Sequence, residues 1–152
     1  MEATLDTTNS SDRATSPHPA AAVSVPTATK RRWAGRTMSG LAVAFLLFDS
    51  AMKLAMVQPV LDASERMGFP VDTARPIGVI LLACVAIYLV PRTAVLGAVL
   101  LTGYLGGAIA SHLRLGDPLL SHTLFPIYFG VLVWGGLYLR DARVRTIVPW
   151  SE

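Results

Sequence analysis

The sequence predicts an all-α integral membrane protein, a bundle of four membrane-spanning helices preceded by a disordered N-terminal tail. Hydrophobic residues make up 53% of its 152 residues and charged residues only 15%, whereas charged residues are about a quarter of a typical soluble domain. The apolar residues gather in four long stretches, with most basic residues beside them. Such a chain contacts the lipid bilayer, and its net charge of +3 suits anionic lipid headgroups better than nucleic acid.

The beginning of the chain differs in composition from the remainder. Residues 1–32 are rich in Ala, Thr, Ser and Pro and lack Phe, Trp and Tyr. A segment of this kind buries too little apolar surface to offset the entropy that is lost on ordering. We therefore expect a disordered cytoplasmic tail over residues 1–32 and a membrane domain over residues 33–150.

Four segments have the length and composition of membrane-spanning helices. About 20 residues of helix cross the ~30 Å hydrocarbon core of a bilayer. Pro76 suits the first turn of the second span, because the N–H groups of that turn have no partner within the helix. Pro126 lies one turn into the fourth span and is expected to kink it. The predicted spans are 37–57, 74–90, 93–112 and 121–139.

The loops and the basic residues predict the orientation. Residues 60–75 combine apolar and charged side chains in the manner of a short amphipathic helix at the membrane interface. Eight Lys and Arg residues lie near the span ends on one side and three on the other. Positive residues are retained in the cytoplasm, so we expect both termini to be cytoplasmic, in a bacterial inner membrane. The eight are Lys30, Arg31, Arg32, Arg36, Arg92, Arg140, Arg143 and Arg145, and the three are Arg66, Arg75 and Arg114.

The third span carries small residues at four-residue spacing. Gly103, Gly107 and Ser111 lie on one face of this helix. Rows of small residues let two helix backbones approach closely in a membrane. Packing against another helix of the same chain is the favoured interpretation, and dimerisation of two copies through this face is the alternative.

Two opposite charges lie within the first span. Asp49 and Lys53 are four residues apart and share one helical face, with the acid first, which is the better order for an ion pair. Each charge alone would cost about 3 kcal/mol in hydrocarbon, so both should face the bundle interior and pair with each other. The pattern fits a ligand-binding site and a purely structural ion pair equally well.

Two histidines bracket the loop between the last two spans. His112 ends the third span and His122 begins the fourth, and Arg114 and Asp117 lie between them. Ionisable groups in hydrocarbon turn toward the bundle interior, so we expect these residues and the charged pair of the first span to form one polar pocket. Imidazoles can bind a metal or haem, relay protons or bind a quinone carbonyl. Too few further ligands are present for a metal or haem to be expected, and histidines at the interface without a ligand are the alternative.

Four stretches of the sequence carry a family resemblance. They are DSAMK at 49–53, PRTAVLGAVLLTGYLGGAIASH at 91–112, GDPLLSH at 116–122 and WGGLYLRD at 134–141. Over about residues 39–149 the chain resembles the DoxX-like family of small bacterial membrane proteins. The resemblance implies a four-helix membrane protein with relatives named for a thiosulfate:quinone oxidoreductase or quinol oxidase subunit. It transfers no catalytic residue to this chain.

Together these patterns favour an accessory or binding protein that is linked to membrane redox metabolism and contacts quinone or lipid. A quinone-dependent membrane oxidoreductase subunit is one alternative, and a small-solute carrier or membrane assembly factor is another. The sequence contains no P-loop, nucleotide-binding glycine fingerprint, nucleophile elbow or zinc-binding helix, so enzymatic activity stays an open question. The expected partners are the lipid bilayer, a membrane redox protein and a second copy of the chain.

Overall fold

The part of the chain that the structure describes is built from helices. The computed structural model describes residues 26–147, and no strand is present in that range. The elements, in chain order, are α1 (Pro26–Ala55), α2 (Gln58–Arg66), the 3₁₀-helix η1 (Val71–Thr73), α3 (Ala74–Leu89), α4 (Ala94–Leu115), the π-helical turn η2 (Leu119–Thr123), α5 (Phe125–Arg140) and α6 (Ala142–Ile147).

Four helical segments are long and apolar enough to cross a membrane, which confirms the predicted fold class. Large apolar side chains on their outer faces are exposed, among them Phe48 and Val79. Lipid acyl chains are the solvent that such faces require. The four segments are Thr29–Ala55, Val71–Leu89, Ala94–Leu115 and Leu119–Arg140.

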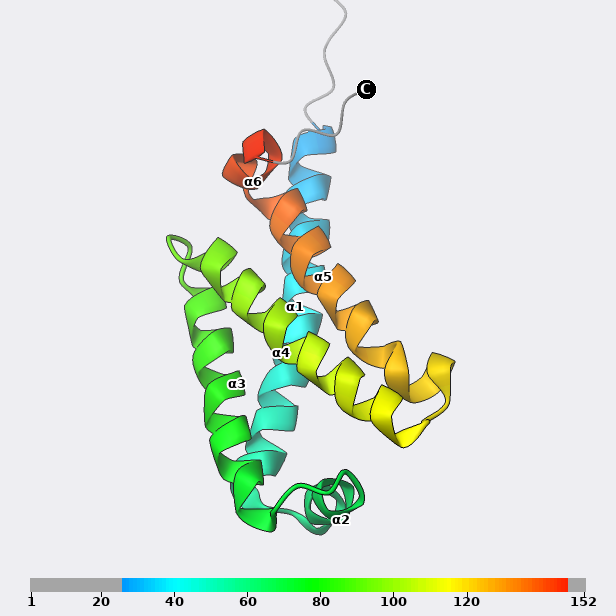
Figure 1. The fold of residues 1–152 in the computed structure, drawn as a ribbon. Coiled ribbons are helices and arrows are strands. Elements are labelled where there is room, and N and C mark those ends of the chain that lie inside the picture. Colours follow the sequence, from blue (N-terminus) through cyan, green and yellow to red (C-terminus); the bar gives the residue numbers. More distant parts are fainter. Residues whose placement is uncertain (1–25, 148–152) are drawn as a thin grey trace, which may run out of the picture.

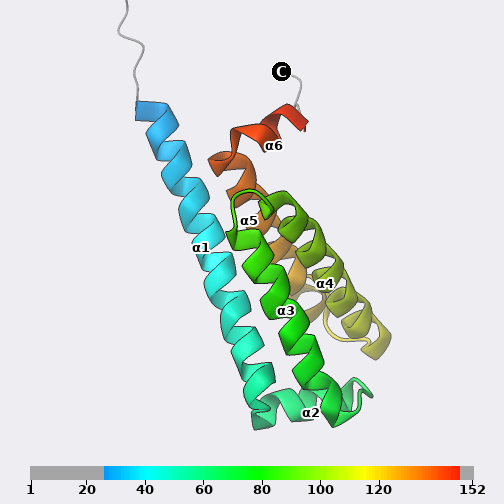
Figure 2. The ribbon, with the colours of Figure 1, turned by 90° about the vertical axis from the view of Figure 1, so that its left-hand side faces the viewer.

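The four spans pack as a ring. α1 contacts α3 and α5, and α4 also contacts α3 and α5, so α1 and α4 face each other across the bundle (Figures 1 and 2). The start of α1, the turn between α3 and α4, and α6 lie toward one end, which we call the basic end (Figure 1). α2 and the turn between α4 and η2 lie toward the opposite end, which we call the α2 end.

The boundaries of the first and last helices differ from the predictions. α1 begins at Pro26, so the last part of the segment 1–32 is helical, and residues 1–25 lie outside the described residues. Lys, Arg and Ala between residues 28 and 36 favour helix, and proline is tolerated in a first helical turn. α6 was not predicted. Residues 148–150 of the expected membrane domain also lie outside the described range.

The fourth span is broken rather than kinked at its proline. The turn η2 ends at Thr123, and a backbone hydrogen bond of 2.7 Å joins the Leu124 N–H to the Leu119 carbonyl. Pro126 then lies in the first turn of α5, where its missing N–H leaves no hydrogen bond unmade. The proline therefore belongs to the start of a new helix, and the expected kink is replaced by a π-helical turn.

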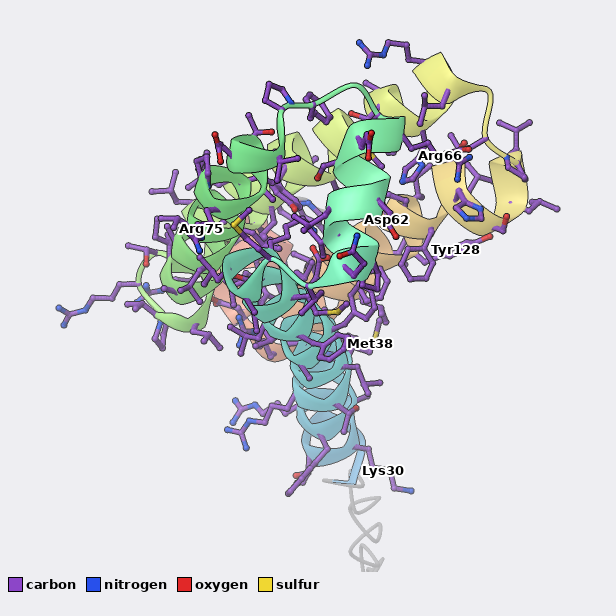
Figure 3. All side chains as sticks on the ribbon, turned by 90° about the horizontal axis from the view of Figure 1, so that it is seen from below. Lys30, Met38, Asp62, Arg66, Arg75 and Tyr128 are labelled. Atoms are coloured by element: carbon purple, nitrogen blue, oxygen red, sulfur yellow. The ribbon has the colours of Figure 1, made fainter. Side chains whose placement is uncertain are left out.

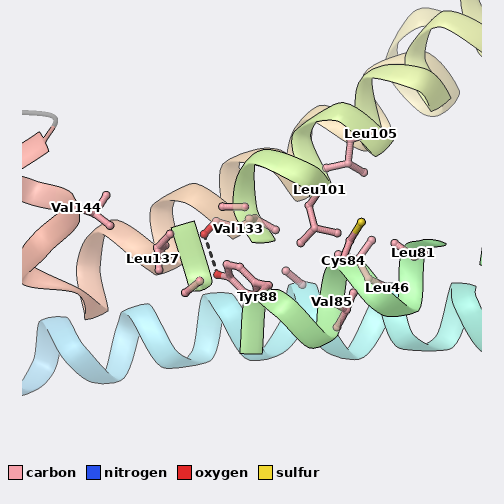
Figure 4. Packing of buried hydrophobic residues seen from close by; sticks show 13 residues of the cluster. Leu46, Leu81, Cys84, Val85, Tyr88, Leu101, Leu105, Val133, Leu137 and Val144 are labelled. Carbon is pink, nitrogen blue, oxygen red and sulfur yellow. Dashed lines mark hydrogen bonds between the residues drawn. The ribbon is translucent and has the colours of Figure 1, made fainter. Parts of the chain in front are cut away.

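The densest packing lies in the half of the bundle nearer the basic end. Tyr88 is fully buried, and its hydroxyl donates to the carbonyl of Val133 at 2.9 Å (Figure 4). The same hydroxyl lies 2.9 Å from the hydroxyl of Ser39. These bonds join α3 to α5 and α1, and the guanidinium of Arg140 lies 4.8 Å from the centre of the Tyr88 ring. The other buried apolar residues of this core are Ala42, Leu46, Leu81, Cys84, Val85, Ala94, Ala98, Leu101, Leu105, Val133, Leu137 and Val144.

Two glycines permit the closest helix contacts of this core. A Cβ added at Gly97 would lie 2.4 Å from the backbone of Tyr88, and one added at Gly136 would lie 2.4 Å from the hydroxyl of Ser39. Real Cβ atoms do not approach other atoms so closely. Glycine at these positions therefore allows α4 to lie against α3, and α5 to lie against α1.

The predicted row of small residues, Gly103, Gly107 and Ser111, does not bring two helices of the chain into close contact. A Cβ added at Gly103 or Gly107 would meet nothing within 4 Å, and the Ser111 hydroxyl donates to the carbonyl of Gly107 in its own helix. The expected packing of these glycines against another helix of the same chain is therefore wrong in the described residues. Their face of α4 borders open space, because the helices separate toward the α2 end.

Candidate functional site

A cavity of about 620 Å³ occupies the half of the bundle nearer the α2 end. All four spans contribute to its walls, and α2 covers it at the end of the bundle. Most of the wall is apolar, with Phe45 from α1, Ile77 from α3 and Phe129 from α5. Phe45 and Phe129 stack with their ring centres 4.2 Å apart. The open face of α4 described above, with Gly103 and Gly107, completes the lining.

The charged pair of the first span lies in this cavity. Asp49 and Lys53 both line it, and the Lys53 ammonium donates to the Asp49 carboxylate at 2.5 Å. Their side chains are 30% and 20% exposed, respectively. The predicted ion pair is therefore present, and one Lys53 donor of the three is used by Asp49. The remaining donors are available to a ligand.

A tyrosine that was not predicted lies beside this pair. Tyr104 lines the cavity, and its hydroxyl is close enough to Asp49 to interact with the carboxylate. It shares one face of α4 with Ala108 and His112, because the three are spaced by four residues. This spacing is the sequence signal that could have identified Tyr104, since His112 was already a candidate.

His112 lines the cavity from α4 and is held by the loop that follows it. Its Nδ1 donates to Oδ2 of Asp117 at 2.7 Å. The other oxygen of Asp117 accepts a hydrogen bond from Arg66 at the end of α2. Since Nδ1 is engaged, Nε2 is the ring atom left to contact a ligand. From the sequence, Arg66 is expected only as a charge in a loop, whereas its partner in the structure lies 51 residues further along the chain.

The electrostatic environment of Asp117 favours its charged form. Its side chain is 3% exposed. The hydrogen bond from His112 lowers the pKa of this carboxyl below its ordinary value, and the charges of Arg66, His112 and His122 act in the same direction, whereas burial opposes them. Asp117 is therefore a buried anion shared between α2 and the wall of the cavity.

Three of the six predicted pocket residues do not line the cavity: Asp117, which lies behind His112, and His122 and Arg114. His122 is exposed and bonds to the hydroxyl of Ser121, although its ring centre is 5.9 Å from that of His112. Arg114 is also exposed and donates to the carbonyl of Met67, just after α2. The expectation that both histidines share the pocket is wrong, because the π-helical turn η2 directs His122 to the surface.

The same residues limit what the site can bind. In the range 26–147, no group of three or more His, Cys, Asp or Glu residues is placed to hold a metal ion. Every buried polar side-chain atom in that range has a hydrogen-bond partner. The arrangement offers a ligand the free N–H donors of the Lys53 ammonium and the Nε2 acceptor of the His112 imidazole, and otherwise surrounds it with apolar side chains.

Comparison with known proteins assigns the family. The sequence model of the DoxX-like family matches residues 37–136, which is well over half of the chain. The chain belongs to the DoxX-like family. The matched region contains the cavity wall residues and the Arg66–Asp117–His112 contacts of this DoxX-like protein. No curated protein and no solved structure matches the chain.

Proposed function

We propose that this DoxX-like protein is an accessory binding protein of the bacterial inner membrane, which holds a lipid-soluble ligand with a polar head, of the quinone or lipid class. The cavity carries this proposal. Its volume of about 620 Å³ falls within the ~300–1,000 Å³ of small-molecule sites, which are mostly apolar with a few polar groups that orient the ligand.

The polar groups suit a ligand head that accepts hydrogen bonds. Lys53 keeps ammonium N–H donors beyond the one bound to Asp49. Quinone carbonyl oxygens accept hydrogen bonds from such groups, and the hydrocarbon tail of a quinone or lipid would contact the apolar wall. The link to membrane redox metabolism is an expectation from the family resemblance, as is association with a membrane redox partner protein.

The orientation of the protein in the membrane is part of the proposal. The eight Lys and Arg residues counted in the sequence lie toward the basic end, where the described part of the chain begins and ends. The positive-inside tendency then supports cytoplasmic termini and an α2 end that faces the opposite side. The open row of Gly103 and Gly107 leaves homodimerisation as a prediction.

Binding can be tested directly with purified protein in lipid nanodiscs. Solvent extraction and an absorbance spectrum would reveal a retained quinone, and titration with a short-chain ubiquinone or menaquinone would give its affinity. We expect saturable binding that Lys53→Met weakens by at least about tenfold, the effect of one lost charge-assisted hydrogen bond. The matched control is Lys30→Met, which removes an exposed lysine at the basic end. Absence of saturable binding of both quinone and phospholipid would refute the proposal.

A further inference from the structure

α2 covers the cavity without being part of the packed core. None of its residues is buried, yet Pro59, Val60 and Ala63 close the cavity at this end. Its main backbone neighbours are η1 and α3. Figure 3 shows α2 lying across the α2 end of the bundle, with Arg66 directed toward the turn between α4 and η2. The apolar side of α2 thus faces the cavity rather than a close-packed helix.

The chain turns sharply on both sides of α2. Met56, between α1 and α2, has a φ of 51°, which side chains other than glycine rarely adopt, and Gly68, just after α2, has a φ of 73°. Short turns of this kind separate α2 from the two spans that it connects. Rotation about a few bonds at these two turns would move α2 away from η1 and α3 while both spans stay helical.

Two side-chain hydrogen bonds hold the C-terminal end of α2 against the bundle. Arg66 donates to the buried carboxylate of Asp117, and Arg114 donates to the carbonyl of Met67. These bonds join α2, or the residue that follows it, to the last turn of α4 and to the turn between α4 and η2. The Arg66 side chain is 64% exposed, so water competes for its guanidinium and the bond can break and re-form readily.

From these contacts we infer that α2 is a hinged lid on the cavity. It turns about Met56 and Gly68, and the bonds from Arg66 and Arg114 keep it closed. When it opens, the cavity becomes accessible to water at the α2 end. Because Asp117 binds both Arg66 and His112, opening also removes one partner of the carboxylate that positions the imidazole in the cavity wall. The role of the lid in ligand admission rests on the proposed function, whereas its movement needs no ligand.

The lid can be tested by the accessibility of a cysteine beneath it. Ala108 lines the cavity and is half-buried, and Ala108→Cys would be labelled by a water-soluble maleimide at pH 7 in nanodiscs, in a Cys84→Ala background. Acyl chains flank the sides of the bundle, so a water-soluble reagent approaches the cavity from the α2 end. We expect slow labelling that Arg66→Gln and Arg114→Gln each accelerate about five- to tenfold. Arg66→Lys should restore most of the protection, and Arg75→Gln, at the same end, should have no effect.

Two results would contradict the inference that α2 is a lid. One is a labelling rate that neither Arg66→Gln nor Arg114→Gln changes, and the other is equal acceleration by Arg75→Gln. An Asp72→Cys variant, exposed at the same end, controls for reagent access. Hydrogen exchange of the unsubstituted chain gives a second measurement, in which α2 should exchange faster than α3 and α4. Equal protection of all three would contradict the inference. Neither assay contains a ligand, so a failure of quinone binding would not contradict the inference that α2 is a lid.

Discussion

Nδ1 of His112 lies 2.7 Å from Oδ2 of Asp117, so a residue in the cavity wall is positioned by a carboxylate in the next loop. The other carboxylate oxygen binds Arg66 on α2. One anion therefore connects the covering helix to the wall of the cavity. Its protonation state affects both contacts at once.

The first prediction concerns pH. The charged groups that face Asp117 are Arg66 from α2, His112 from α4 and His122 from η2, and their net effect is to lower its pKa below the ordinary value of about 4. A lowered pKa in the folded state means that Asp117 stabilises the fold fully above pH 4, and that this contribution is lost as the pH falls through the lowered pKa.

The melting temperature in detergent, measured between pH 3 and pH 8, checks this expectation. Asp117→Asn should lower it at pH 5 and above, and the difference should shrink below about pH 4. A difference that disappeared between pH 7 and pH 5 would show that another group controls these contacts.

The second prediction compares a glycine in the packed half of the bundle with a glycine in the half that holds the cavity. Gly97→Ala places a methyl group against the backbone of Tyr88 and should destabilise the protein by about 1–3 kcal/mol. Gly103→Ala meets open space, so it should leave stability unchanged or raise it by up to about 1 kcal/mol through helix propensity. Unfolding in mixed detergent would measure both variants. Equal destabilisation would mean that the Gly103 face is packed in the membrane, as in a dimer.

The third prediction concerns the hydroxyl of Tyr88. Tyr88→Phe removes the bonds to Ser39 and to the Val133 carbonyl and should destabilise the bundle by about 1 kcal/mol. Tyr128→Phe, at a half-exposed position, is the matched control and should have little effect. A Tyr88→Phe variant as stable as the parent chain would show that ring packing alone holds these helices together.

The fourth prediction is a double-mutant cycle on the ion pair. Lys53→Met leaves Asp49 without its partner in a largely apolar cavity, which should cost about 3 kcal/mol. Asp49→Asn combined with Lys53→Met removes both charges and should cost less than the sum of the two single variants. Unfolding in detergent again provides the measurement. Additive losses would argue against direct pairing in the membrane.

The fifth prediction tests the orientation. Reporter proteins fused to the C-terminus should be active only when the reporter functions in the cytoplasm, because the greater number of basic residues lies at that end. A fusion within the turn between α4 and η2 provides the opposite control. A C-terminus on the outer side would refute the proposed orientation.

The limits of prediction from sequence are clear at particular residues. The spans could be predicted because a run of about 20 apolar residues is typical of a membrane-spanning helix. The Asp49–Lys53 pair could be predicted because both partners lie on one helix, four residues apart. The bond between Arg66 and Asp117 depends on how α2 folds back over the bundle, which no local pattern encodes. Four-residue spacing of glycines likewise does not indicate which helical face meets a neighbour.

Tyr88, Gly97 and Gly136 hold the helices together in one half of the bundle, while the cavity occupies the other half. The contacts around Tyr88 and the lining of the cavity therefore involve mostly different residues, with Leu46 and Leu105 belonging to both the core and the lining. Substitutions at wall positions such as Ile77 or Phe129 can reshape the cavity while the contacts around Tyr88 persist. In a bundle divided in this way, the shape of the cavity can change one substitution at a time while the fold is kept.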